Sequence, residues 1–78
     1  MNRFEKIYPN YKILGIHEIL VEGVNHYYSS LINNPEDVMC LAKARKDMLN
    51  RKIRVMCLKL EGPTGDIRYA DFSPDELI

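Results

Sequence analysis

Apolar residues between positions 13 and 32 recur at steps of three and four residues, which is the period of an amphipathic helix. The stripe contains Ile13, Ile16, Leu20, Val24, Tyr27 and Leu31. Gly15 and Gly23 oppose a helix, because each costs up to about 1 kcal/mol relative to alanine. The β-branched residues of this segment favour instead a strand pair that turns at Glu22-Gly23. Because the stripe continues to Leu31 without a shift, we predict a helix over residues 13–32 and keep the hairpin as the alternative.

The start and end signals of a second helix agree with its apolar pattern. Asn34 suits the N-cap and Pro35 the first helical position, and the two acidic residues that follow complement the positive helix end. The expected buried stripe contains Val38, Leu41, Ala42, Met48 and Leu49. Arg51 and Lys52 would lie at the negative end of the helix dipole. We therefore predict a helix over residues 35–51.

The pattern after this helix is typical of a β-hairpin. Residues 53–60 place apolar side chains on both faces of a strand, as a well-covered strand does. Gly62-Pro63-Thr64-Gly65 is a tight-turn sequence, in which proline sets the bend and glycine accepts the exit. Residues 67–72 then return as the second strand.

A capping-box pattern near the C-terminus predicts a last helical turn. It consists of Ser73 and, three residues later, Glu76, with Pro74 at the first helical position. We expect the residues that follow, Leu77 and Ile78, to fill an apolar groove on this chain or on a neighbour.

These elements predict a single compact domain over residues 1–78. The expected fold class is α+β, with two amphipathic helices packed on a C-terminal antiparallel β-hairpin and a short terminal helical turn. The alternative is ββαββ, with residues 12–30 as a hairpin. The 46% of hydrophobic and 28% of charged residues are typical of a globular chain, and 78 residues allow one domain at most.

No segment of the sequence is suited to the membrane. The N-terminal residues 1–6 are too charged for a signal peptide. The longest apolar run is far shorter than the roughly 20 residues of a membrane span. We expect a soluble, cytoplasmic protein.

The metal-binding and nucleophilic residue types do not form a known site. Cys40 and Cys57 are not in a Cys-x-x-Cys arrangement, and we expect both to be reduced core residues. His17 and His26 are nine residues apart and do not form a His-Glu-x-x-His helix. The sequence also lacks a serine-hydrolase elbow and a phosphate-binding glycine loop. We expect no catalytic residue, no metal, no cofactor and no enzymatic activity.

Charge is unevenly distributed although the net charge is zero. Residues 43–59 hold seven of the eleven cations and a single acid, Asp47, and the segment after them is mainly acidic. Such a cluster is able to bind phosphate groups, or it is neutralised by the acidic C-terminal segment. The residues of the candidate anion or nucleic-acid site are Lys43, Lys46, Arg51, Lys52 and Arg54.

The first hypothesis for the function is protein binding. Small size, missing catalytic motifs, a surplus of apolar and tyrosine residues and the apolar C-terminus favour a non-enzymatic regulator or inhibitor, of the kind that phages and mobile elements carry, which acts on a protein partner or as a homodimer. Its expected interface residues are Tyr28, Leu77 and Ile78. The alternative is a nucleic-acid or nucleotide binder that uses the basic segment 43–59.

Overall fold

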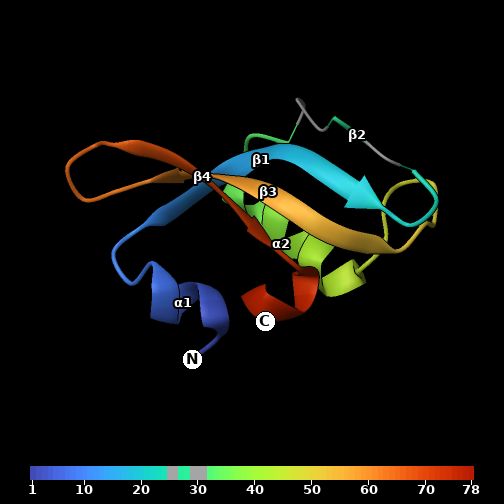
Figure 1. Cartoon of the computed structure of the whole chain (residues 1–78), viewed down its shortest axis with the longest axis horizontal. Coiled ribbons are helices and arrows are strands. Elements are labelled where there is room, and N and C mark those ends of the chain that lie inside the picture. The colour runs from blue at the N-terminus through green and yellow to red at the C-terminus, as the bar shows by residue number, and fades with distance from the viewer. Residues whose placement is uncertain (25–26, 29–31) are drawn as a thin grey trace.

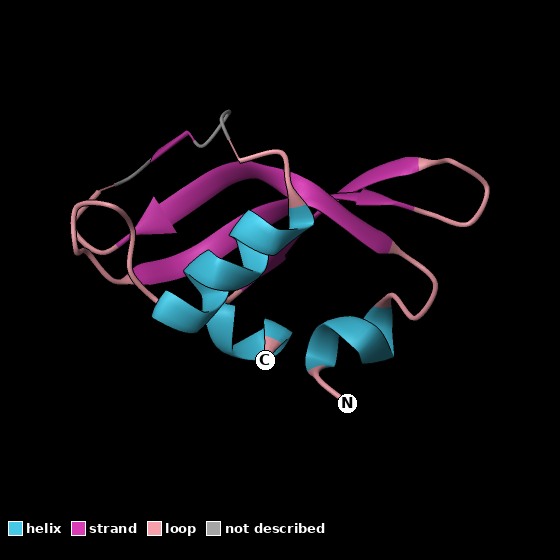
Figure 2. Ribbon diagram, turned by 180° about the vertical axis from the view of Figure 1, so that it is seen from behind, coloured by secondary structure: helices cyan, strands magenta, loops and turns pink. Residues whose placement is uncertain are grey.

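The fold is an antiparallel sheet with one helix lying across one of its faces. The computed structural model describes residues 1–24, 27–28 and 32–78. The strands β1 (Lys12–Val21), β2 (Tyr27–Tyr28), β3 (Ile53–Glu61) and β4 (Ile67–Phe72) form a sheet of order β2-β1-β3-β4. Helix α2 (Pro35–Ala44) crosses one face, and the 3₁₀ turn η1 (Pro74–Leu77) lies on the same side (Figure 2). Helix α1 (Arg3–Ile7) contacts η1, so the two chain ends lie near each other (Figure 1).

Strand β1 takes the place of the first predicted helix. Its pairing with β3 shifts register three times along its length. A β-bulge inserts one extra residue into a strand, so residues three apart in β1 face the same side of the sheet. Ile13, Ile16 and Ile19 all face the core in this way, opposite Leu60, Leu58 and Met56 of β3. The first two register shifts therefore give residues 13–19 the three-residue spacing of a helix, and this spacing contributed to the wrong prediction.

The backbone of residues 32–33 passes close to Gly15. A Cβ atom at Gly15 would lie 2.5 Å from the carbonyl oxygen of Ile32 and 2.8 Å from the Cα of Asn33. The N–H of Ile16 donates a hydrogen bond of 2.9 Å to the same carbonyl. No side chain fits at position 15 without moving this crossing segment, and this explains the glycine.

The predicted fold class, two amphipathic helices on a C-terminal hairpin, is wrong. Among the described residues, α2 is the one helix longer than five residues. Strand β2 pairs antiparallel with β1, with Tyr28 opposite Glu18 and Tyr27 opposite Ile19. Gly23 lies in the turn after β1 with a φ of 81°. The ββαββ alternative is closer to the structure, because two strands precede α2 and two follow it.

Helix α2 begins as predicted but is shorter. The side chain of Asn34 accepts a hydrogen bond of 2.9 Å from the N–H of Glu36 at the start of the helix. At its end Arg45 is left-handed, with a φ of 58°, and its N–H donates to the carbonyl of Leu41 at 2.8 Å. The predicted helix over residues 35–51 is therefore too long, because a left-handed residue cannot continue a right-handed helix.

The predicted C-terminal hairpin is confirmed. Strands β3 and β4 pair in unbroken register, from Met56 opposite Phe72 to Glu61 opposite Ile67. Alternate residues of β3 supply the centre of the core, because strand side chains alternate between the two faces. The buried apolar core consists of Phe4, Ile16, Ile19, Val21, Val38, Ala42, Ile53, Met56, Leu58, Leu60, Phe72 and Leu77.

The short terminal turn joins the two ends of the chain. The N–H of Ser73 donates to the carboxylate of Glu76 at 2.9 Å, as the capping pattern predicted. The same carboxylate forms an ion pair of 2.9 Å with Arg3. The side-chain amide of Asn2 donates to the carbonyl of Leu77 at 2.9 Å. These contacts hold α1 and η1 together at one edge of the core.

Candidate functional site

The segment between α2 and β3 forms a tight ribbon of residues 45–52, the yellow loop at the right of Figure 1. Lys46 and Lys52 pair across it as an antiparallel bridge. The N–H of Asp47 donates to the carbonyl of Arg51 at 2.8 Å, and the N–H of Asn50 donates to the carbonyl of Asp47 at 3.0 Å. This segment, predicted as the last turns of a helix, is instead a small hairpin turn.

Asp47 organises the ribbon from inside. Its side chain is only 6% exposed, and its Oδ1 atom accepts hydrogen bonds from the N–H groups of Leu49 at 2.9 Å and Arg51 at 2.8 Å. Its Oδ2 atom is also buried and has no hydrogen-bond partner among the described residues. A short acidic side chain that accepts bonds from the next residues is a standard way to fix a turn.

Two residues in unusual backbone conformations lie at the two sides of this turn. Arg45 and Asn50 have φ values of 58° and 61°, and no other non-glycine residue in the described part of the chain has a positive φ. Such conformations cost roughly 1–3 kcal/mol each and are often found at functional sites. The ribbon is therefore held in one shape at an energetic cost.

The tip of the ribbon exposes two large apolar side chains. Met48 is 77% exposed and Leu49 is 60% exposed. The sequence pattern placed both in a buried helical stripe, and that prediction is wrong. Asp47 precedes these two residues in the sequence and Asn50 follows them. Aspartate and asparagine are common in turns, so this pair is the sequence signal that indicates a turn here.

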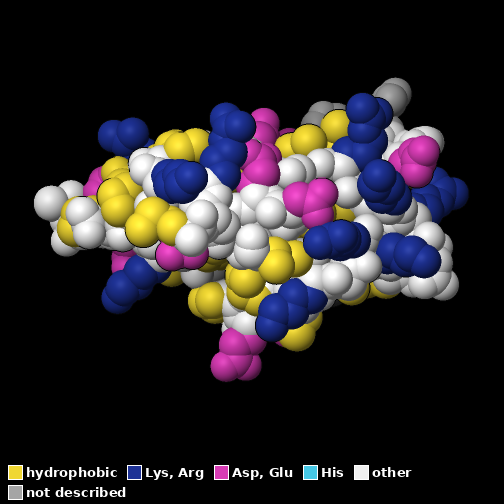
Figure 3. Space-filling view, turned by 90° about the horizontal axis from the view of Figure 1, so that it is seen from below, with side chains coloured by type: hydrophobic (Ala, Val, Ile, Leu, Met, Phe, Trp, Pro, Cys, Tyr) yellow, Lys and Arg dark blue, Asp and Glu magenta, His cyan; other side chains and the backbone are white. Residues whose placement is uncertain are grey.

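The ribbon brings most of the predicted basic residues to one end of the molecule. Lys46, Arg51 and Lys52 belong to it, while Lys43 precedes it on α2 and Arg54 follows it on β3. All five are exposed, and none forms an ion pair within the part of the chain that the structure describes. Figure 3 shows lysine and arginine side chains gathered at this end.

Two details of the charge arrangement matter for binding. The bridge places Lys46 directly opposite Lys52, and like charges in that position repel each other. Arg45 instead pairs with Asp75 of the acidic C-terminal segment at 3.1 Å. Both partners of this pair are mostly exposed, so it contributes at most about 1 kcal/mol. The acidic segment thus pairs with one cation beside the ribbon, and no ion pair of the described residues involves the five candidate residues.

A small hollow of about 260 Å³ lies where the ribbon meets η1. Arg45, Lys52 and Arg54 line it on one side, and Ser73 and Asp75 line it on the other. The backbone N–H of Ile53 donates to the carbonyl of Arg45 at 3.2 Å beside it. The hollow extends the cationic surface from the ribbon to the start of β3.

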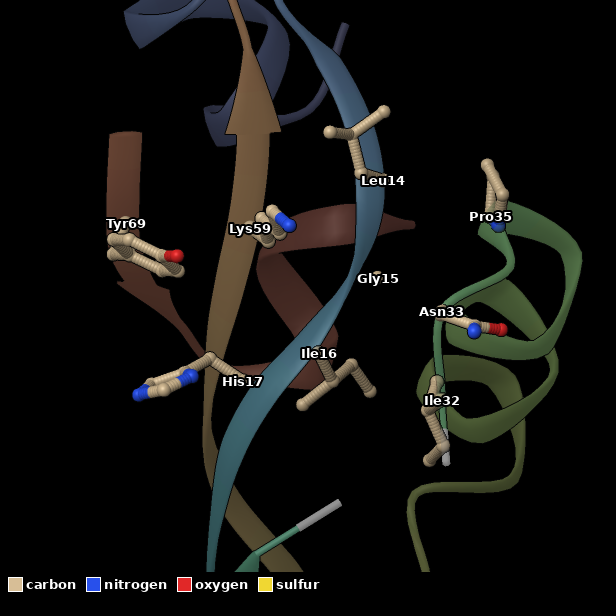
Figure 4. Close-up of a pocket in the computed structure, with 9 residues that line it drawn as sticks. All are labelled: Leu14, Gly15, Ile16, His17, Ile32, Asn33, Pro35, Lys59 and Tyr69. Carbon is tan, nitrogen blue, oxygen red and sulfur yellow. The ribbon is translucent and has the colours of Figure 1, made fainter. Parts of the chain in front are cut away.

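A second, larger groove of about 590 Å³ lies along β1 beside the start of α2 (Figure 4). His17, Lys59 and Tyr69 lie on one side of it, and Ile32 to Pro35 form the other side. The rings of His17 and Tyr69 are 5.0 Å apart and tilted by 53°. The two rings come from β1 and β4, which β3 separates, and Lys59 of β3 lies here, apart from the ribbon cations.

The cysteines differ from each other. Cys40 is exposed, so the prediction that both cysteines lie in the core is wrong for it, and Cys57 is half-buried on β3. Burial and the neighbouring carboxylates of Asp71 and Glu18 raise the pKa of the Cys57 thiol to about 11. A thiol with this pKa is almost wholly protonated at neutral pH and is a poor nucleophile. Among the described residues, no group of histidine, cysteine and acidic side chains could hold a metal ion.

The structure describes the side chains of two of the three predicted interface residues. Leu77 is only 2% exposed and fills this chain's own core, whereas Ile78 is 54% exposed. The side chain of Tyr28 lies outside the described residues, as does His26.

No protein-family model, no curated protein and no solved structure matches this chain. Within the described residues, the helices are all too short or too polar to cross a lipid bilayer. The site must therefore be interpreted from its own geometry and charge.

Proposed function

We propose that this protein binds nucleic acid through the basic end formed by Lys43, Lys46, Arg51, Lys52 and Arg54. The observation that carries the proposal is the bridge between Lys46 and Lys52. Two like charges held face to face, with further cations beside them and no ion pair to a carboxylate of the described residues, gain stability when an anion binds between them. The phosphate backbone of a nucleic acid offers a row of such anions.

The zero net charge of the chain is compatible with this function. Residues 43–59 hold seven of the eleven cations and one of the eleven acids, so the molecule carries a charge asymmetry rather than an overall charge. A field of one sign at one end orients a polyanion toward that end during an encounter. Nucleic-acid binding by this protein depends on the local cluster of cations and not on the net charge of the chain.

The expected signature is a steep dependence on salt. If Lys46, Arg51, Lys52 and Arg54 each contact a phosphate of duplex DNA, the slope of log Kobs against log salt is about −3.6. Binding then weakens roughly 150-fold between about 50 and 200 mM salt.

The test is fluorescence anisotropy with labelled duplexes and single strands over a series of salt concentrations. In the variant Lys46→Gln/Lys52→Gln, the slope should fall to about −1.8 because two contacts are lost. The matched control is Lys6→Gln/Lys12→Gln, which removes two exposed cations of α1 and β1 away from the ribbon. Equal slopes in the two variants would refute the assignment to the ribbon.

The exposed edge of the sheet supports protein binding as a second candidate function, with a second copy of this chain as the partner. Strand β4 is an edge strand without a register shift, and its Ile67 and Tyr69 are 45% and 54% exposed. An unprotected edge of this kind can add another strand through its free backbone groups. Sedimentation of the wild type and of Tyr69→Lys tests this, because a dimer through β4 should dissociate in the variant. A wild-type protein that stays monomeric at all concentrations contradicts this candidate.

A further inference from the structure

The two apolar side chains at the tip of the ribbon have no role in the core. Met48 and Leu49 are 77% and 60% exposed, and cations lie on both sides of them in the sequence and in the ribbon. We infer that Met48 and Leu49 form a wedge that enters the minor groove of a nucleic-acid duplex and inserts between two base pairs. This inference rests on the proposed function and specifies its ligand as a duplex that is unstacked at one step.

The ribbon is built to present this wedge in a fixed position. The buried Asp47 accepts hydrogen bonds from the N–H groups of Leu49 and Arg51. Asn50 adopts a left-handed conformation directly after the tip. A second anchor is the N–H of Glu22, which donates to the carbonyl of Lys52 at 2.9 Å and ties the base of the ribbon to the end of β1. A preorganised tip loses little conformational freedom when it binds.

The chemistry of the tip matches a duplex step. Leucine and methionine are among the side chains that wedge between base steps in the minor groove, where they partly unstack the bases and bend the duplex. The side chains of Lys46 and Lys52, which lie opposite each other below the tip, are placed to meet the phosphates that flank such a groove. Apolar insertion and phosphate contact therefore come from one ribbon of eight residues, 45–52.

The same composition disfavours a single strand as the main ligand. Proteins that bind single strands without sequence preference stack the bases on aromatic rings. The ribbon contains no aromatic residue. Tyr8 packs with Phe4 and Phe72 beside α1, and Tyr69 contacts His17 on the sheet. None of these rings belongs to the ribbon.

The experiment uses two duplexes of equal length, one fully paired and one with a central mismatch, each with a donor and an acceptor dye at its ends. Unstacking costs least at a mismatch, so the wild type should bind the mismatched duplex about tenfold more tightly and shorten its end-to-end distance. An adenine analogue whose fluorescence rises on unstacking, placed at the mismatch, should brighten on binding.

The variant Met48→Ser/Leu49→Ser should lose the tenfold preference, the bend and the fluorescence rise but keep the wild-type salt slope. Its matched control is Ile7→Ser/Ile78→Ser, since these side chains are similarly exposed at 49% and 54% but lie outside the ribbon. Circular dichroism checks that each variant is folded.

The outcomes separate the wedge from the proposed function. If the tip variant binds and bends both duplexes like the wild type, the wedge is refuted while the salt slope still supports phosphate binding. If the wild type binds duplexes without a bend or a fluorescence rise, the wedge is also refuted. If it binds no duplex at low salt, both proposals fail, and binding to phosphatidylserine vesicles that depends on Met48 and Leu49 would assign the tip to a lipid surface instead.

Discussion

The roles of Gly15 and Arg45 follow from the conformation and surroundings of their backbone rather than from their residue type. Gly15 appears in the sequence as a weak helix breaker, and in the sheet it leaves space for the backbone of residues 32–33. Arg45 appears as a cation of a helix, and in the structure it is the left-handed residue that ends the helix. For Gly15 the constraint comes from a segment that is distant in the sequence. For Arg45 it is a backbone conformation that arginine does not favour.

Replacing Gly15 by alanine should destabilise the protein by about 2 kcal/mol, because the new Cβ would meet backbone atoms that cannot easily move. The matched control is Gly23→Ala, where the added Cβ has no neighbour within 4 Å and only the positive φ of 81° is unfavourable. That change should cost about 1 kcal/mol. Urea unfolding measures both, and a Gly15→Ala variant as stable as the wild type would contradict the close crossing.

At the scale of the elements, the hairpin of β3 and β4 and the start of α2 were predictable, because their signals are local. Residues 13–19 of β1 gave a helical period because two register shifts each insert a residue into β1 and bring every third residue to the core. The ribbon was missed for a related reason: its apolar tip, Met48 and Leu49, continues the helical stripe of α2 by chance. A periodic pattern reports which residues are apolar, and tertiary contacts decide whether they are buried.

The ribbon should depend on Asp47. In Asp47→Ala the two N–H groups of Leu49 and Arg51 lose their acceptor, so the turn opens and trypsin should cut after Arg51 or Lys52 several-fold faster than in the wild type. Asp47→Asn keeps the accepting oxygen and should be cut at nearly the wild-type rate. Mass spectrometry of the fragments over time measures the rates, and equal cleavage of all three proteins would show that Asp47 does not hold the turn.

At the scale of the whole molecule, the basic ribbon lies beside η1, and η1 in turn joins the two chain ends. The cations gather on the ribbon at one end, and α1 and η1 join the two termini through Arg3 and Glu76. The hydrogen bonds from Ser73 and the charge of Arg3 lower the pKa of the Glu76 carboxyl below its ordinary value. A lowered pKa in the folded state means that this carboxylate stabilises the fold above the unfolded-state pKa of about 4.3.

The stabilisation from Glu76 should therefore be present at neutral pH and be lost as the pH falls below about 4. The melting temperature of Glu76→Gln should be lower than that of the wild type at pH 7, and the two should converge at pH 3. The control Glu5→Gln changes an exposed acid of α1 and should melt like the wild type at pH 7. A difference in melting temperature between Glu76→Gln and the wild type that stays constant from pH 7 to pH 3 would contradict the lowered pKa of Glu76.

By itself, the sequence determined the features that rest on neighbouring residues. These are the start of α2 at Asn34-Pro35, the strands on both sides of Gly62-Pro63-Thr64-Gly65, the terminal turn at Ser73, and the concentration of cations in residues 43–59. Only the tertiary structure decided that residues 12–21 form a strand, because its register shifts arise from pairing with residues of β3 that lie 32 to 49 positions further along the chain. Only the tertiary structure placed the cations around an exposed apolar tip. This arrangement depends on the buried carboxylate of Asp47 and on the left-handed backbone of Arg45 at the end of α2, and not on a periodic pattern of apolar residues.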